Sequence, residues 1–192
     1  MSTKVVTGKV RFSYANIFEP KAPQGGGEPK YSVTLLIPKD DKATLAKIAE
    51  AIKDARDNFC NRNGANALPA KPVTSLHDGD GQRLNGEDFG PECRGHYVIT
   101  VSSKTKPVIV DRNGQPILDS TEVYSGCYGR ASINFYGYNK AGKKGVSAGL
   151  LAVQKLADGE PFGTVGSADD FNDGYKDNDL GDLLGDDSDI PF

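Results

Sequence analysis

The 192-residue chain has the length of about one domain and can bury a core. Its longest apolar run, residues 148–153, is far shorter than the roughly 18 residues of a membrane-spanning helix. The first residues lack a signal-peptide pattern, so we expect a cytoplasmic protein with no membrane partner. Three widely spaced cysteines, Cys60, Cys93 and Cys127, do not predict a disulfide framework.

The net charge of −3 combines two oppositely charged regions. Residues 169–192 hold nine Asp and one Lys, a net charge of −8, which leaves a net charge of +5 on residues 1–168. Such asymmetry indicates contact with nucleic acid or an interaction tail. From residue 167 onward the sequence is also rich in Gly and poor in apolar residues, which predicts disorder. We therefore expect a folded domain at 1–166 and a disordered acidic tail at 167–192.

The first 64 residues predict two strands, a loop and a helix. The strands are residues 4–18 and 31–37, and the glycine-rich residues 20–29 form a flexible loop between them. In the first strand, one face carries Val6, Val10 and Phe12, and the other carries Lys9 and Arg11. Asp40 or Asp41 caps the helix, and Asn63-Gly64 ends it. Its apolar stripe is Leu45, Ile48, Ala49, Ile52, Ala55 and Phe59.

The rest of the domain predicts more strands and turns. In chain order these are an irregular loop at 61–95 that includes His77, a strand at 96–103, a hairpin turn at Arg112-Asn113-Gly114, a strand at 127–138, a loop at 139–145, and a strand or partly helical segment at 146–156. Five or six short strands and one long helix make a mainly β, α+β fold. They fit the OB-fold, a five-stranded Greek-key barrel whose exposed faces bind oligonucleotides.

The strand at 127–138 carries the clearest functional pattern. Its inward face is apolar, with Ala131, Ile133 and Phe135, and its outward face carries Tyr128, Arg130, Ser132, Asn134, Tyr136 and Tyr138. Aromatic rings exposed on a strand are suited to stack with nucleobases of any sequence, and an arginine can stack or meet a phosphate. The alternative is that a loop or the tail covers these rings, or that they form a second small core.

Basic residues flank the aromatic strands in the sequence. If they line one groove, they would follow a phosphate backbone and release its counterions. Any single one of them can equally be an ordinary surface residue. The residues expected to meet phosphates are Lys9, Arg11, Lys104, Lys106, Lys143 and Lys144, together with Arg130.

The chain ends in an acidic run followed by an apolar pair. An acidic spacer that ends in apolar residues and a free carboxylate is a suitable short docking peptide, because a pocket can hold the ring and a basic rim the carboxylate. The residues expected to bind a protein partner are Asp186, Asp187, Asp189, Ile190, Pro191 and Phe192. At a net charge of −8, this tail can also compete with DNA for the basic groove.

No pattern for catalysis, a metal or a cofactor emerges. Cys93 and His96 lack a matching second pair for zinc, and the run from Asp78 to Gly81 departs from a calcium loop at Gln82 and Arg83. Two histidines in the whole chain make a catalytic pair hard to assemble. We therefore predict a protein that is not an enzyme and uses no cofactor.

Several segments resemble the single-stranded DNA-binding proteins of tailed bacteriophages. They are residues 31–39 (YSVTLLIPK), 125–128 (SGCY) with 134–139 (NFYGYN), and 145–147 (GVS) with 153–156 (VQKL). The resemblance covers roughly residues 3–165. The final DDSDIPF separately resembles the tail tip of bacterial single-strand binding proteins, which recruits replication and repair enzymes. Together these resemblances imply an OB-fold that coats single-stranded DNA during phage replication and recombination.

We therefore expect a sequence-independent single-stranded DNA-binding protein of an infected bacterial host. Tyr128, Tyr136 and Tyr138 would stack with bases, and the loops at 20–29 and 61–95 would close over the strand. Expected partners are single-stranded DNA and, through the tail, replication, recombination or repair enzymes, with self-association on DNA as a further expectation. The alternatives are a protein-interaction adaptor that uses the tyrosine face, a strand-annealing recombination protein, and a metal-dependent nuclease, against which the sequence weighs.

Overall fold

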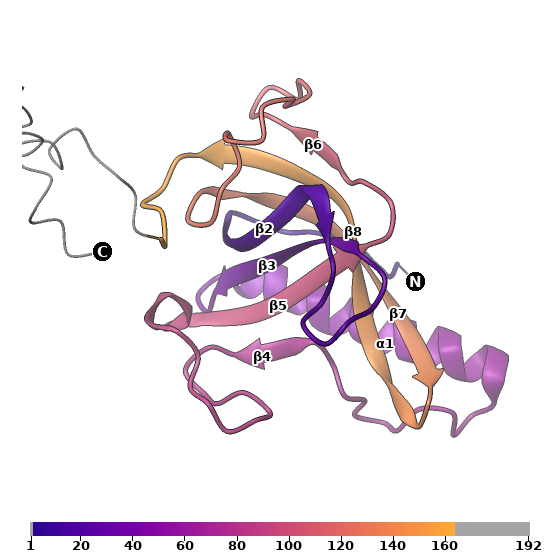
Figure 1. Ribbon diagram of the computed structural model, residues 1–192. Helices are drawn as coiled ribbons and strands as arrows, with labels where there is room; N and C mark the ends of the chain where they lie inside the picture. Colours follow the sequence, from indigo (N-terminus) through magenta and orange to yellow (C-terminus); the bar gives the residue numbers. More distant parts are fainter. Residues whose placement is uncertain (1, 164–192) are drawn as a thin grey trace, which may run out of the picture. The chain divides into compact units, whose positions relative to one another are not determined.

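The computed structural model describes residues 2–163, which form a mainly β fold with one long helix (Figure 1). Residues 164–192 lie outside the described residues, so the domain boundary at 166 stays a prediction. The elements are β1 (Lys4–Val6), β2 (Val10–Lys21), β3 (Lys30–Pro38), α1 (Lys42–Asn63), β4 (Leu76–Asp78), the 3-10 turn η1 (Pro91–Cys93), β5 (His96–Ser103), β6 (Val108–Val110), β7 (Tyr128–Lys140) and β8 (Lys143–Ala157).

Five of the strands close into a barrel. Antiparallel pairing joins β2 to β3, β3 to β5, β8 to β7 and β7 back to β2, and a parallel pairing of Ser102 with Gly149 joins β5 to β8. The short strands β1, β4 and β6 add to β7, β5 and β8. This is the five-stranded barrel of the predicted OB-fold.

The barrel interior holds the main core, and α1 covers part of the barrel. Alternate residues of the strands point inward, and Phe12, Leu35, Ile99, Ile133 and Phe135 are almost fully buried. The helix packs against β7, β1 and β8 and lies behind the sheet in Figure 1. Within residues 2–163, α1 carries too few apolar residues to cross a membrane.

The helix begins and ends at the predicted residues. Asp41 caps it by accepting a hydrogen bond of 3.0 Å from the backbone N–H of Thr44, and Gly64 follows its last turn with φ of 110°. Ile48 and Ala55 of the predicted stripe are buried, whereas Ala49 is exposed. The buried positions Ala51 and Cys60 show that the apolar face is rotated slightly from the predicted stripe.

Some predicted boundaries were wrong. The first predicted strand is interrupted at residues 7–9, so Val5 rather than Val6 faces the core, and β2 continues to Lys21. The predicted loop at 139–145 is only the two-residue turn Ala141-Gly142, whose positive φ angles suit a tight hairpin. Residues 146–156 lie within β8 and are therefore strand. His77 lies in β4, where cross-strand pairing orders part of the predicted irregular loop.

Candidate nucleic-acid interface

Small polar side chains form the floor of a groove on the outer surface of β2, β3 and β5. Ser13 pairs across the strands with Thr34, and Thr34 pairs with Thr100. The hydroxyl oxygens of these two threonines lie 2.9 Å apart. In the next row, Ser32 pairs with Ser102. Because these side chains are short, larger side chains at the edges stand above them and leave a hollowed surface.

Three adjoining hollows form this groove. The Lys104 hollow, about 670 Å³, extends along Ser32 and Ser102. The Phe89 hollow, about 330 Å³, lies over Thr34 and Thr100, and the Tyr138 hollow, about 440 Å³, lies between residues 73–84 and the β7–β8 hairpin. The hollows share lining residues: Tyr14 and Ser32 join the first two, Lys30 and Lys140 the first and third, and His77 the second and third. We call the surface made by these three adjoining hollows the groove.

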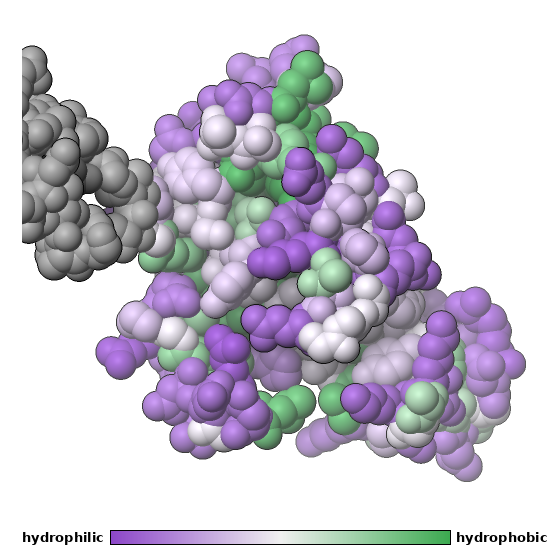
Figure 2. All heavy atoms as spheres, in the orientation of Figure 1, coloured by the Kyte–Doolittle hydropathy of each residue, from purple (hydrophilic) through white to green (hydrophobic). Residues whose placement is uncertain are grey.

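Figure 2 shows hydrophilic residues over much of the face seen in Figure 1, with hydrophobic residues between them. A hollow separates the region around β4 from the hairpin, in agreement with the position of the Tyr138 hollow.

Lysines line the hollow with the largest volume of the three. The Lys104 hollow is lined by Lys21, Lys30, Lys104 and Lys140, against one acidic residue, Glu28. The Lys104 ammonium lies 2.6 Å from the Glu28 carboxylate, and the hydrogen bond and charge of this lysine lower the pKa of that carboxyl. The lining therefore keeps an excess of positive charge, which attracts a polyanion.

Tyr136 and Tyr138, two of the predicted stacking residues, line the groove. Both border the Tyr138 hollow beside Lys140 and Ser147. Tyr136 is 47% exposed, and its ring passes over Gly149, where an added Cβ would lie 3.7 Å from a ring carbon. Tyr136 also borders the hollows that lead toward Phe59 and Asn63 at the end of α1. A large ring with free surface among lysines is what base stacking requires.

Tyr128 lies at the opposite end of β7 in a different environment. The Lys9 ammonium lies 4.8 Å and the Arg11 guanidinium 5.3 Å from the centre of its ring. Arg11 also lies 4.3 Å from the Phe162 ring, and it donates hydrogen bonds to the carbonyl oxygens of Gly126 and Glu160. Three predicted site residues thus lie together here, but the two cations contact the Tyr128 ring and leave less of its surface for a ligand.

The remaining predicted phosphate contacts are dispersed. Arg130 is exposed, and its Nε donates a hydrogen bond of 2.9 Å to the carbonyl of Thr7. Lys106 lies over the ring of Phe18, 5.8 Å from its centre. Lys143 and Lys144 begin β8 at the exposed hairpin tip, opposite Lys140 and Asn139. Of the predicted basic residues, Lys104 is therefore the one that contributes to the groove, where it lines the first of the three hollows.

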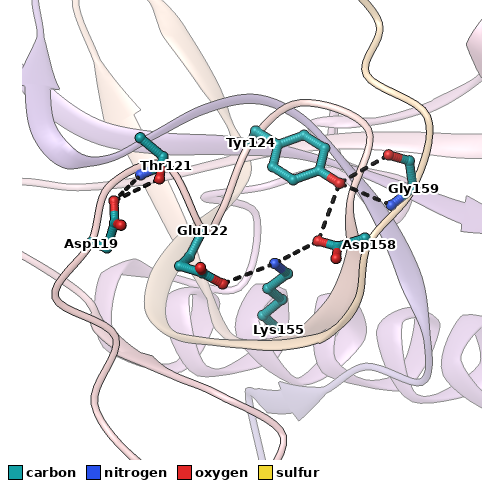
Figure 3. A network of polar contacts seen from close by, with 7 residues as sticks. All are labelled: Asp119, Thr121, Glu122, Tyr124, Lys155, Asp158 and Gly159. Atoms are coloured by element: carbon teal, nitrogen blue, oxygen red, sulfur yellow. Dashed lines mark hydrogen bonds and ion pairs between the residues drawn. The ribbon is translucent and has the colours of Figure 1, made fainter.

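A polar network fixes the segment that follows β8 (Figure 3). The Tyr124 hydroxyl accepts a hydrogen bond from the N–H of Gly159 and lies within hydrogen-bond distance of the Gly159 carbonyl and the Asp158 carboxylate. The Lys155 ammonium lies between the carboxylates of Asp158, at 2.7 Å, and Glu122, at 3.3 Å. Close by, Asp119 accepts two hydrogen bonds from Thr121.

The charges of this network support one another. Partial burial lowers the pKa of Lys155, but the hydrogen bonds and charges of Asp158 and Glu122 outweigh it and raise that pKa overall. Lys155 in turn lowers the pKa of Asp158. The fixed segment places Phe162 against Leu36, Cys93 and Val98, next to the Phe89 hollow.

An ion-pair cluster fixes the loop that follows β4. The Lys39 ammonium lies 2.5 Å from the Asp78 carboxylate and 2.7 Å from that of Asp80. The hydrogen bonds of these two aspartates raise the pKa of Lys39, and Lys39 lowers theirs. Asp80 also accepts a hydrogen bond from the N–H of Gly95. The aspartates that suggest a calcium loop in the sequence therefore tie the loop after β4 to the end of β3.

The two loops expected to close over DNA border the groove. Residues 22–28 line the Lys104 hollow, and residues 73–92 contribute to the walls of the Tyr138 and Phe89 hollows. Sequence reasoning missed Tyr14, Lys30, His77 and Phe89 as lining residues. His77 and Phe89 lie in a segment without a regular pattern, so no periodicity indicates where they point. Lys30 directly precedes the predicted strand at 31–37, and this position at a strand end is the sequence signal that could have placed it beside the groove.

The predicted partner-binding residues, from Asp186 to Phe192, lie outside the described residues, so that prediction rests on the sequence alone. The prediction that the protein binds no metal ion concerns the whole chain and stays a prediction. Within residues 2–163 no group of three or more His, Cys, Asp or Glu side chains is arranged to hold a metal ion.

The sequence matches a family of phage proteins. The family described as "Enterobacter phage Enc34, ssDNA-binding protein" matches residues 3–181. The chain belongs to this family. It is 34% identical over 178 residues to "Putative protein p50" of Acyrthosiphon pisum secondary endosymbiont phage 1, covering 88% of this chain and 93% of that protein. The family is one of non-enzymatic proteins.

Solved structures agree with this membership. The single-stranded DNA-binding protein of bacteriophage Enc34 in complex with ssDNA matches with a TM-score of 0.72 and 32% identity, over 84% of this chain and 90% of that one. A C-terminal truncation of the same phage protein matches with a TM-score of 0.70 and 31% identity, over 83% and 88% of the two chains. The gp2.5 protein of bacteriophage T7, a single-stranded DNA binding protein, has a TM-score of 0.57 at 18% identity, over 93% and 97%. That last likeness concerns the fold alone.

Proposed function

We propose that this protein binds single-stranded DNA without sequence preference, and that the groove is its binding surface. The observation that carries the proposal is the coincidence of exposed aromatic rings and lysines along one groove, in a chain whose family includes a phage protein solved with ssDNA. Rings supply stacking that every base can use, and lysines supply contacts that every phosphate can use, so neither distinguishes sequence.

The two ends of β7 contribute differently to this proposal. Tyr136 and Tyr138 have free ring surface in the groove, which supports their role in stacking. Tyr128, Arg11 and Lys9 stay candidate contacts at the far end, although their mutual contacts leave less surface for a ligand. Arg130, Lys106, Lys143 and Lys144 stay proposed phosphate contacts outside the three hollows.

In the infected cell, the protein would coat and protect single strands during phage DNA replication, recombination and repair. The acidic tail would recruit partner enzymes through Ile190, Pro191 and Phe192, and DNA that occupies the groove would release the tail for them. A flexible tether keeps such a tail at an effective concentration of about millimolar near the groove, which suits reversible competition. The tail's role rests on its charge and its final residues.

Fluorescence anisotropy with an unstructured dT oligonucleotide tests the proposal. We expect tight binding that weakens with added salt, and much weaker binding to a duplex of equal length. Absence of binding at low salt, also after removal of residues 169–192, would refute it and favour the protein-interaction adaptor. Faster pairing of complementary strands in the same samples would add strand annealing to the function.

A further inference from the structure

Tyr14 occupies a position that the regular pattern of β2 does not explain. Val10 and Phe12 face the core, so strict alternation would turn Tyr14 inward as well. Instead, its side chain is 65% exposed. The register explains the change, because Ser13 pairs with Thr34 while Asn16 pairs with Ser32. One extra residue is thus inserted in β2, and this β-bulge turns the tyrosine outward.

The bulge is achieved at a cost to the backbone. Tyr14 has φ of 47°, a left-handed conformation that a residue with a Cβ rarely adopts. Ala141 is the other non-glycine residue of this kind within residues 2–163, and it lies in the tight turn of the β7–β8 hairpin. The Asn16 side chain holds the bulge by donating a hydrogen bond of 3.1 Å to the Tyr14 carbonyl. Strained residues of this type concentrate at functional sites.

The strained backbone at Tyr14 places its side chain at the junction of two hollows. Its side chain borders both the Lys104 hollow and the Phe89 hollow, beside the small residues Ser32 and Thr34 of the floor. Lysines line one of these hollows, and Arg83, His77 and Phe89 line the other. An exposed ring between two hollows, above a floor of short side chains, leaves space for a flat aromatic ligand against its face.

We propose that Tyr14 forms a nucleobase-stacking site at the junction of these two hollows, and that the β2 bulge exists to aim its ring there. The inference rests on the proposed function and adds a residue that strand periodicity hides. Tyr14 would hold one base of a strand whose other bases stack on Tyr136 and Tyr138.

The test measures binding and stability of the full chain together. Tyr14→Ala should weaken binding to a dT oligonucleotide by about 5- to 150-fold, the usual range for loss of one stacked base, whereas Tyr14→Phe should keep nearly all of it. Tyr14→Gly should weaken binding similarly but keep or raise the Tm, because glycine removes the left-handed strain. Leu118→Ala is the control, since Leu118 is 90% exposed and lines none of the three hollows.

The outcomes separate the inference from the function it rests on. If the wild-type chain binds but Tyr14→Ala binds equally well, the stacking site is refuted and the proposed function stands. If Tyr14→Ala loses affinity together with a marked fall in Tm, Tyr14 is structural and the inference is overturned. If the wild-type chain fails to bind, both are refuted.

Discussion

The two ends of β7 carry the same residue type in opposite states. At one end the Tyr128 ring lies between Lys9 and Arg11, and the donors of Arg11 reach the carbonyls of Gly126 and Glu160. At the other end Tyr136 is 47% exposed and borders hollows lined with lysine. Both rings point outward from the same strand, so facing solvent is not enough to make a ring available to a ligand.

The comparison also separates two uses of positive charge. At the Tyr128 end the cations contact aromatic rings and backbone carbonyls within the protein, which stabilises the fold. The Lys104 hollow is lined by four lysines and a single carboxylate, that of Glu28, which pairs with Lys104. Positive charge is therefore left for a polyanion. We therefore expect substitutions at the first end to lower stability and substitutions at the second to lower affinity.

The largest effect should come from the groove lysines. Replacing Lys30, Lys104 and Lys140 with Gln should reduce the slope of log affinity against log salt by about 2 and weaken binding at 50 mM salt by about 500-fold, if each lysine meets one phosphate. The matched control replaces the exposed helix lysines Lys42, Lys47 and Lys53, which changes the net charge equally. Equal effects of both triple variants would show that overall charge, and not the groove, attracts DNA.

Next in size is the difference between the two tyrosines. Tyr136→Ala should weaken binding to dT and to mixed-sequence oligonucleotides alike, by about 5- to 150-fold. Tyr128→Ala should weaken binding less and should lower stability by about 1 kcal/mol, because it removes the ring that Lys9 and Arg11 contact. Anisotropy titrations and thermal melts of both variants measure this. A larger affinity loss at Tyr128 would reverse the comparison.

Arg11 gives a test of the structural end. Arg11→Ala should lower the free energy of unfolding by about 2 kcal/mol, since charged donors are removed from the carbonyls of Gly126 and Glu160. Urea unfolding measures this, with Lys30→Ala, which removes an exposed lysine of the groove, as the control that should leave stability unchanged. Unchanged stability combined with weakened DNA binding would return Arg11 to the phosphate contacts.

A smaller effect is expected from the tail. Removing residues 169–192 should tighten DNA binding severalfold at low salt and have no effect at high salt, because screening suppresses the competition of the tail for the groove. In the variant that lacks the three groove lysines, the same deletion should change affinity little. Anisotropy on the four combinations decides this, and an equal gain in both backgrounds would place the tail's effect outside the groove.

The smallest effect concerns pH. Lys155 lowers the pKa of Asp158, so the ionised carboxylate stabilises the fold above its unfolded-state pKa of about 4 and this contribution is lost as the pH falls through the lower folded-state value. Asp158→Asn should therefore reduce the Tm slightly at pH 7, and the difference between the two Tm values should shrink as the pH falls below about 4. A difference that stays constant as the pH falls would assign the effect of the substitution to packing or hydrogen bonds.

The sequence predicts the elements of the barrel well where apolar residues recur with a regular period. In β7, burial of Ala131, Ile133 and Phe135 follows the period of two, and the helix follows from Asp41 at its start and Gly64 at its end. The same regularity fails in β2, where the inward positions change from even-numbered Phe12 to odd-numbered Ile17. This change from even-numbered to odd-numbered inward positions is the sequence signal of the bulge. It would have predicted an outward-facing residue between Phe12 and Ile17, such as Tyr14.

The site was harder to predict than the fold. Periodicity gives the side of a strand on which a ring lies, but not which partners from distant segments cover it. The Arg11 contacts to Gly126 and Glu160 join residues more than a hundred positions apart. Likewise, Lys30 and Lys140 approach one hollow only because β3 and β7 belong to one closed barrel.

Photo-crosslinking tests the binding surface most directly. A dT oligonucleotide that carries 5-iodouracil at single positions is bound to the full chain, irradiated, and the crosslinked peptides are identified by mass spectrometry. Binding in the groove predicts crosslinks at Tyr136, Tyr138 and Tyr14. Crosslinks confined to Tyr128 or to α1, with none in the groove, would contradict it.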